Sequence, residues 1–339
     1  MNSKALLQTV QHIRISLGSA ITLGLMDSMI ETSPTTLYML TYYKGKCFAN
    51  CLFCSQARSS KSKADRLSRI IWPRYELTSV LQKLKVVADQ RFERICLQTL
   101  NYPNMFDELL YIISQIRQHS NLPLSVSCQP LNDRSIKRLK SLCVDRLCIP
   151  LDAANEQLFR KVKGDLADGP YSWKAHLDSL KRAVGIFGKG KVTTHFIVGL
   201  GETDKDLLSI LQSSTDLGIL TSLFAFSPIR GTSKENDSRP VLTRYRILQL
   251  INFLISKRIA TIRDFQFNNK GEIKTSVLSF LDVEKYMQGG QPFQTYGCDG
   301  CNRPYYNEPV SGPIYNYPRK LTLEELEETK NIIRNNWNK

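Results

Sequence analysis

The sequence lacks long apolar runs, internal repeats and low-complexity tracts, and each absence argues against a class of protein. Its most apolar early stretch, Ile15–Ile30, is interrupted by Asp27, lacks a basic region directly before a long apolar run, and is followed by no convincing cleavage site. This pattern argues against a signal peptide, and the lack of repeats argues against a solenoid. We therefore expect a soluble, cytoplasmic protein, and 339 residues suffice for a large buried core.

Acidic residues are scarce relative to basic ones. The chain has 46 Lys and Arg against 31 Asp and Glu, which gives a formal net charge of +15 and a pI near 9.4. This balance fits a polyanionic partner, and nucleic acid and an acidic protein are both candidates. A solvated basic surface explains the same number equally well, because net charge bears on association and solubility rather than on identity.

Cysteine is abundant by comparison, with nine residues. An odd number in a chain of this length without a secretory signal favours reduced thiols and metal sites over a disulfide framework.

Short apolar runs alternate with amphipathic segments from Thr36 onward, as expected when parallel strands are joined by crossover helices. The pattern predicts at least six consecutive βα units. The expected strands are Thr36–Thr41, Arg94–Thr99, Leu124–Cys128, Asp145–Leu151, Lys191–Val198, Ser222–Ser227 and Ile262–Phe267. The expected helices are Thr78–Gln90, Phe106–His119, Asp133–Leu142, Ser172–Phe187, Asp204–Leu217 and Thr243–Lys257.

This alternation predicts an α/β fold, a TIM-type (β/α) barrel that is complete or nearly complete. We expect an N-terminal helical extension over residues 1–35, the barrel over 36–290, and a C-terminal segment over 291–339. That last segment holds an aromatic, Pro- and Gly-rich tail with two cysteines (Tyr296–Arg319) and a closing helix, Leu321–Trp337, after a helix-like stretch at Val277–Tyr286.

Three cysteines lie in one short loop, "KGKCFANCLFCSQ" (Lys44–Gln56), after the first expected strand. In a barrel, the loops after the strand carboxyl ends all open on one face, so Cys47, Cys51 and Cys54 should lie there. Zinc would need a fourth protein ligand, and the four histidines are all remote in sequence from this loop. A [4Fe-4S] cube with three thiolate ligands instead keeps one iron open, which can chelate an amino-acid group.

The spacing C-x3-C-x2-C, with Phe53 directly before the last cysteine, resembles the signature of the radical S-adenosylmethionine (SAM) superfamily. The resemblance implies that the methionine group of S-adenosyl-L-methionine fills the vacant iron position. It also implies that one electron from the cluster cleaves the sulfonium to a 5′-deoxyadenosyl radical.

Further segments resemble biotin synthase over roughly residues 36–230. "IVGLGET" (Ile197–Thr203) resembles the adenine-contacting strand, which implies a cofactor contact for Val198, although any βα junction needs a Gly turn and an N-cap such as Thr203. "IPLDAANEQLF" resembles the segment whose acidic residue meets the ribose hydroxyls, which implies that role for Asp152, although an Asp in this position is often only a helix cap. The resemblance also implies cofactor contacts for Phe53, Gln98 and Thr99.

The remaining cysteines suggest a second cluster. In biotin synthase, cysteines on consecutive strands help to hold an auxiliary cluster, and the resemblance implies that Cys96 and Cys128 occupy two of these positions in this chain. At the third position this chain has Thr193 instead of a cysteine, which argues against biotin synthesis itself. The tail supplies Cys298 and Cys301 as a C-x2-C pair that could complete an auxiliary [4Fe-4S] cluster, although free or zinc-binding cysteines are the alternative. The other two cysteines, Cys143 and Cys148, look like ordinary small buried residues.

The cysteine loop, "LSRIIWP", "LQTLNYP" and "CNRPYYNEPVSGPIYNYPR" together resemble the archaeal two-protein lipoyl synthases. The resemblance implies radical sulfur insertion, as a sulfurtransferase in lipoate biosynthesis, into an octanoyl chain on a lysine of a lipoyl carrier domain or H-protein. It also implies a paralogous radical SAM subunit and an electron donor such as ferredoxin as partners. An acidic carrier would suit a basic face, for which the candidates are Arg58, Lys61, Lys63, Arg66 and Arg69; solvated charge is the alternative.

Other functions are compatible with the same residues. A tRNA-modifying radical enzyme would also use two clusters and a basic surface, but such enzymes usually carry extra domains. Other biotin synthase-like enzymes that rearrange amino acids or build cofactors fit as well, since the barrel is generic. A non-enzymatic iron–sulfur carrier is the alternative from a different class.

Overall fold

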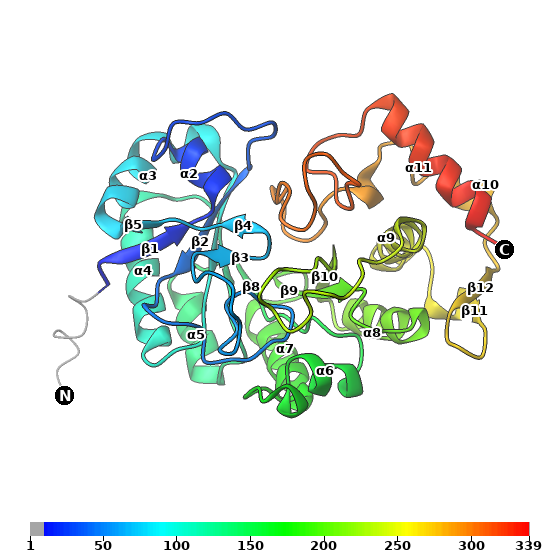
Figure 1. Ribbon diagram of the computed structural model, residues 1–339, viewed down its shortest axis with the longest axis horizontal. Coiled ribbons are helices and arrows are strands. Elements are labelled where there is room, and N and C mark those ends of the chain that lie inside the picture. Colours follow the sequence, from blue (N-terminus) through cyan, green and yellow to red (C-terminus); the bar gives the residue numbers. More distant parts are fainter. Residues whose placement is uncertain (1–9, 339) are drawn as a thin grey trace.

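A mixed sheet of eight strands forms the centre of the protein (Figure 1). The computed structural model describes residues 10–338, apart from the side chains of residues 87–89. The strands of the sheet are β1 (His12–Ile15), β2 (Thr36–Thr41), β5 (Arg74–Glu76), β6 (Arg94–Gln98), β7 (Leu124–Ser127), β8 (Arg146–Cys148), β9 (Val192–Val198) and β10 (Leu220–Ala225).

The strand order is β10-β9-β8-β7-β6-β2-β1-β5. The run from β2 to β10 is parallel throughout, while β1 is antiparallel to both β2 and β5. The α/β fold with a TIM-type arrangement that the sequence predicts is confirmed. The ladder of strand pairs among the described residues ends at β10 and at β5 and does not join these two strands.

Helices cover the outer side of the sheet. The helices are α2 (Leu17–Leu23), α3 (Leu77–Arg91), α4 (Met105–His119), α5 (Asp133–Ser141), α6 (Glu156–Val162), α7 (Trp173–Phe187), α8 (Asp204–Asp216), α9 (Leu242–Ser256), α10 (Phe280–Glu284) and α11 (Leu323–Asn336). Of these, α4 to α9 follow the parallel strands of the sheet, α2 and α3 follow β1 and β5, and α10 and α11 lie together beyond α9. Short 3-10 turns occur at Asp165–Ala167, Ile262–Asp264 and Gln291–Phe293, and two hairpins lie outside the main sheet: β3 (Arg66–Leu67) with β4 (Ile70–Ile71), and β11 (Phe265–Phe267) with β12 (Ile273–Ser276).

The residue pattern explains these elements. All six residues of β2 are buried, as expected for a central strand of a sheet covered on both faces. Along α4, the buried residues Leu109, Ile112, Ile113 and Ile116 recur at helical spacing and face the core. At the start of α8, Thr203 and Asp206 form a capping box, so the predicted N-cap is confirmed. In residues 10–338, no helix is both long and apolar enough to cross a membrane.

The expected six βα units are present, with boundaries within a few residues of those predicted. The seventh expected strand is wrong: Ile262–Asp264 is a 3-10 turn, and Phe265–Phe267 pairs with β12 in a separate hairpin. The pattern missed α6 and β1. Although β1 precedes Thr36, it pairs with β2, so the N-terminal extension contributes a strand to the main sheet as well as the helix α2.

The C-terminal tail returns from the α9 end of the molecule and closes the amino ends of the parallel strands (Figure 1). Arg94 at the start of β6 donates from Nε to the Asp299 carbonyl (2.9 Å), and Arg146 at the start of β8 donates to the Asp299 carboxylate (2.5 Å). The Thr36 hydroxyl at the start of β2 donates to the Gly300 carbonyl (2.6 Å). The tail is therefore part of the barrel rather than a linker beside it.

Candidate active site

A pocket opens at the carboxyl ends of the parallel strands and has about 1090 Å³ of empty space, its open mouth included. The loop that holds Cys47, Cys51 and Cys54 forms one wall, and the ends of β6 to β10 form the others. Apolar surface predominates in the lining, but 12 of its 27 residues have polar or charged side chains. A mixed lining of this kind is usual for a site that binds a small molecule. Throughout, this cavity is called the central pocket.

Neighbouring segments hold the cysteine loop rigidly. The backbone N–H of Phe48 donates to the Asn101 carbonyl (2.7 Å), and the N–H of Leu52 donates to the Val162 carbonyl (2.9 Å). The buried Asn50 side chain donates to the Ala167 carbonyl (2.8 Å) and accepts from both the backbone N–H and the hydroxyl of Ser59. Because the loop is braced from both sides, the positions of its three thiols are set before any ligand binds.

The chemistry of the three thiols fits cluster ligands. Burial raises the pKa of all three, that of Cys54 to about 12, while the Asn101 N–H opposes this at Cys47 and the Lys163 charge opposes it at Cys51. They become thiolates only when a strongly positive group binds them. In residues 10–338, no three Cys, His, Asp or Glu side chains are grouped closely enough for a single metal ion. Three thiols in one loop match the three-thiolate donor set of a [4Fe-4S] cluster with one open iron.

Asp152 lies at the centre of a buried charged network beside this loop. Lys163, which is fully buried, donates to Asp152 Oδ2 (2.7 Å) and to the Pro150 carbonyl (2.5 Å), and His195 Nε2 lies 2.8 Å from Asp152 Oδ1. Although burial opposes it, the charges of Lys163 and His195 hold the pKa of Asp152 well below its usual range. Asp152 has a positive φ of 65°, unusual for a residue other than glycine, and its N–H and carbonyl bridge to β9.

Such a strained residue persists only where its surroundings hold it, and strain of this kind clusters at functional sites. Both carboxylate oxygens of Asp152 already have a protein partner. Each oxygen keeps a second lone pair, so the predicted contact with ribose hydroxyls would be additional to the network rather than a replacement for it.

Of the other predicted cofactor contacts, Phe53, Gln98 and Thr99 line the central pocket. Val198 instead is fully buried within the main hydrophobic core, because it faces the opposite side of β9 from its neighbour Ile197, which lines the pocket. The structure thus places Ile197, and not Val198, where a ligand in the pocket could touch it.

A second group of thiols, Cys96, Cys298 and Cys301, lies on the inner side of the barrel below the pocket. Burial is the main cause that raises the pKa of both Cys96 and Cys301. The charges of Cys301 and Cys298 raise the pKa of Cys96 further. The Cys298 charge likewise contributes to a pKa of about 11 for Cys301. Two of the three thiols have hydrogen-bond partners: Tyr38 OH lies 3.3 Å from Cys301 Sγ, and Ser125 Oγ lies 3.5 Å from Cys298 Sγ. We call Cys96, Cys298 and Cys301 the second thiol group.

The remaining cysteines lie apart from that group or at its edge. Cys128 is buried and lines the central pocket, and burial and then the Cys148 charge raise the pKa of its thiol. Cys148 was expected to be an ordinary buried residue, but it is partly exposed and its Sγ lies 3.9 Å from His195 Nδ1. Cys143 is exposed rather than buried, because it follows the end of α5 in a left-handed turn. Thr193 is the register partner of Cys148 in β9.

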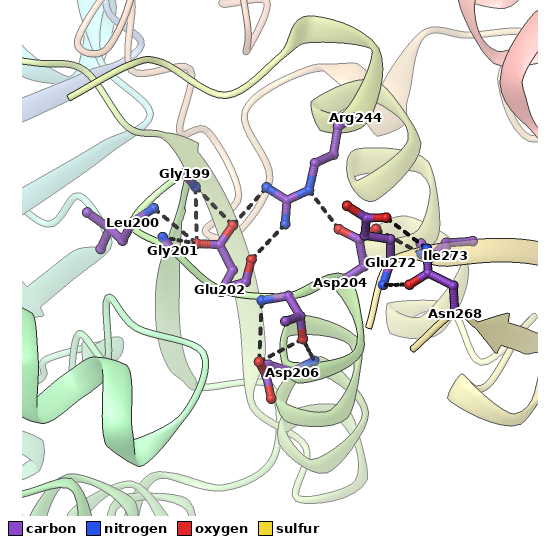
Figure 2. A network of polar contacts seen from close by, with 11 residues as sticks. Gly199, Leu200, Gly201, Glu202, Asp204, Asp206, Arg244, Asn268, Glu272 and Ile273 are labelled. Carbon is purple, nitrogen blue, oxygen red and sulfur yellow. Dashed lines mark hydrogen bonds and ion pairs between the residues drawn. The ribbon is translucent and has the colours of Figure 1, made fainter. Parts of the chain in front are cut away.

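The Gly-rich turn after β9 is closed by a carboxylate of the chain itself (Figure 2). The Glu202 side chain accepts from the backbone N–H groups of Gly199, Leu200 and Gly201 at 2.9–3.2 Å, and Arg244 on α9 donates to it from NH1 (3.0 Å). The φ angles of Gly199 and Gly201, +104° and +120°, favour glycine at both positions. Because Glu202 fills the nest of N–H groups, this turn is an internal brace and leaves no room for a phosphate.

Three pocket features were missed by the sequence analysis. Lys163 and His195 are far from the cysteine motif in sequence, and no local signal marks them as partners of Asp152. Arg303 lines the central pocket with its guanidinium stacked between Phe224 (4.2 Å) and Tyr306 (4.8 Å). For Arg303, the sequence did offer a local signal, because this residue follows the Cys298–Cys301 pair by two positions.

Comparison with known proteins gives one family. Residues 42–213, about half of the chain, match the family model described as the radical SAM superfamily. A biotin synthase from Persephonella marina is 28% identical over 214 residues, covering 61% of this chain and 59% of that protein. An uncharacterized protein from Methanocaldococcus jannaschii is 25% identical over 204 residues, covering 57% and 50%. A biotin synthase from Streptococcus agalactiae is 23% identical over 263 residues, covering 74% and 75%.

The chain therefore spans only about half to three fifths of the length of the first two relatives. Among solved structures, methylornithine synthase is similar with a TM-score of 0.50 and 13% identity, covering 71% of this chain and 67% of that one. A FeFe-hydrogenase maturase from Carboxydothermus hydrogenoformans is similar with a TM-score of 0.51 and 18% identity, covering 76% and 63%. At such identities these likenesses bear on the fold alone.

Proposed function

The chain belongs to the radical SAM superfamily, and on that premise we propose that it inserts sulfur into an aliphatic acyl group, as a lipoyl synthase-like enzyme. The observation that carries the proposal is the presence of two thiol groups in one barrel. Cys47, Cys51 and Cys54 lie at the carboxyl ends of the strands, and the second thiol group lies on the inner side near the amino ends. A substrate in the central pocket would lie between them.

Each thiol group is suited to hold an iron–sulfur cluster. The loop cysteines would bind three irons of a [4Fe-4S] cluster, and the second thiol group would bind an auxiliary one. When bound, the first cluster and S-adenosylmethionine supply a carbon radical that can abstract hydrogen from an unactivated C–H bond, and the auxiliary cluster supplies sulfur. The named relatives support sulfur insertion as the reaction class, because several of them are biotin synthases.

The protein's own residues position and shield the reactants. Asp152, held between Lys163 and His195, presents a fixed anionic edge that can accept hydrogen bonds from ribose hydroxyls. Phe53 and Ile197 contribute apolar walls that exclude water. The lining also includes other apolar side chains, such as Leu40, Leu100 and Ile229, which a saturated chain could contact.

The proposed substrate is an octanoyl group amide-linked to a lysine of a lipoyl carrier domain or H-protein. A paralogous subunit would share the two sulfur insertions, and a one-electron donor such as ferredoxin would supply the reducing equivalent. Biotin synthesis is the second candidate because of the named relatives, but Thr193 stands where the resemblance would require a third cysteine on the strands.

The test uses anaerobically reconstituted full-length protein with an octanoyl-lysyl peptide, S-adenosylmethionine and a reductant, with and without the paralogue. We expect thiolated peptide by mass spectrometry. Two four-iron cubes imply about eight irons per chain, and changing both Cys298 and Cys301 to Ala should leave about four. That variant should still cleave the cofactor but transfer no sulfur. An unmodified peptide even in the presence of the paralogue would contradict the lipoyl assignment.

A further inference from the structure

Two loops beside the central pocket carry basic residues. Leu67, Ser68 and Ile229 line the pocket, and their immediate neighbours in sequence are basic. The first loop carries Lys61, Lys63, Arg66 and Arg69, and the second loop carries Arg230 and Arg239. We call these six residues the basic rim.

The two loops are joined through their backbones. The Lys61 N–H donates to the Gly231 carbonyl (2.7 Å), and the Ser62 hydroxyl donates to the Arg230 carbonyl. A Cβ atom at Gly231 would lie 2.5 Å from Ser62 N, so the close approach requires glycine there. The basic rim is therefore a fixed arrangement brought together by the fold, and not a run of charge along one flexible loop.

The positive charge of the rim is only partly balanced: Asp65 lies in the first loop, Glu235 and Asp237 lie in the second, and basic residues outnumber acidic ones in both loops together. No ion pair joins any of its six residues to an acidic group within the described part of the chain. Arg58, which the sequence grouped with this run, is different because it forms an ion pair with Asp168. Burial and then the nearby Arg239 charge lower the pKa of Arg69, against the opposing effect of Glu308. Like charges held this close favour an anionic partner.

An apolar groove continues from the rim. Arg69 and Ile70 line this second hollow together with Met29, Ile71 and Val310, which are 97%, 39% and 56% exposed. The hollow is also lined by Tyr305, whose hydroxyl donates to Glu31 (2.5 Å). The three exposed apolar side chains suit an apolar protein contact. An anionic protein with a small apolar patch would match both the rim and the groove.

We propose that the basic rim and the adjoining groove are the docking surface for an acidic carrier protein that delivers the acyl chain into the central pocket. The inference rests on the proposed function, since a protein-bound substrate must present its modified lysine at this mouth. It adds Arg230 and Arg239 to the surface and removes Arg58 from it. Attraction between the basic rim and an acidic carrier would chiefly raise the rate of encounter and the affinity at low salt.

The experiment measures binding of a fluorescently labelled, acidic octanoyl-lipoyl domain to the reconstituted full-length protein by anisotropy, without turnover. The double variant Arg230→Glu with Arg239→Glu should weaken the affinity at least tenfold at low salt, and the loss should shrink as salt screens the charges. A matched control changes Lys137 and Arg138, exposed on the outer helix α5, to Glu and should alter affinity less than twofold. Iron content and thermal stability verify that each variant is folded.

A second readout separates docking from chemistry. Cofactor cleavage and activity on a short neutral octanoyl-lysyl peptide should be unchanged in the rim variant. Equal losses in rim and control variants, or no binding by the unchanged protein, would overturn the docking proposal. Tighter, more salt-sensitive binding of tRNA to the same rim would overturn it in favour of a nucleic acid partner. Rim-dependent binding of the carrier without any thiolation would instead uphold docking and contradict the proposed reaction.

Discussion

Replacing Arg244 with Met tests the brace that holds the turn after β9 to α9 (Figure 2). Arg244 donates to Glu202 (3.0 Å) and to Asp204 (2.7 Å), whose side chains are only 1% and 9% exposed. Removing one partner of a buried ion pair typically costs about 3–5 kcal/mol. Because Arg244 itself is 31% exposed, we expect the lower end, a loss of about 3 kcal/mol in the free energy of unfolding.

This loss converts to a measurable change in melting temperature. At about 2.1 cal/mol/K of unfolding entropy per residue, a chain of 339 residues has about 0.7 kcal/mol/K, so Tm should fall by about 4 °C. Thermal unfolding followed by circular dichroism measures it, with Arg138→Met on exposed α5 as the control, expected to change stability by no more than about 0.5 kcal/mol. A shift no larger than that of the control, or full additivity with Glu202→Gln, would refute the reasoning.

Three further changes test other parts of the argument. Arg246→Met removes buried hydrogen bonds to the Tyr315 and Ile314 carbonyls (2.5 Å each), so the tail should become sensitive to limited proteolysis and stability should fall by about 3 kcal/mol or more. Lys163→Met leaves buried Asp152 without its ammonium partner, and urea unfolding should show a loss of about 3–5 kcal/mol. His195 has a pKa raised to about 9, because Asp152 outweighs the opposing effect of burial. Its stabilisation of up to about 3 kcal/mol should be complete below about pH 6.5 and lost as pH rises to 9, and a profile unchanged in His195→Gln would contradict this.

Local signals along the chain sufficed for much of the fold. Apolar runs flanked by caps and turns are properties of neighbouring residues, so β2 and α4 were predicted to within one residue, and Thr203 was recognised as the N-cap of α8. The motif with Cys47, Cys51 and Cys54 was equally visible in the sequence, because one short segment supplies all three thiols. The prediction of a seventh strand was wrong because an apolar run does not reveal its pairing partner. Phe265–Phe267 pairs with β12 and not with a strand of the main sheet.

Only the tertiary structure decided which distant residues meet. Lys163 and His195 reach Asp152 because α6 and β9 converge on the end of β8, and nothing in their own sequence surroundings marks this. The tail could have been a separate appendage, yet hydrogen bonds to the strand starts carry Cys298 and Cys301 to Cys96.

The same distinction holds at the pocket mouth. The sequence by itself determined a chain of net positive charge with a three-cysteine loop and an alternating α/β pattern, since composition and periodicity are local. The fold decided that Arg230 and Arg239 join the cations of the first loop while Arg58 turns away to Asp168. Long-range packing sets such neighbours, and it depends on the whole chain closing around one core.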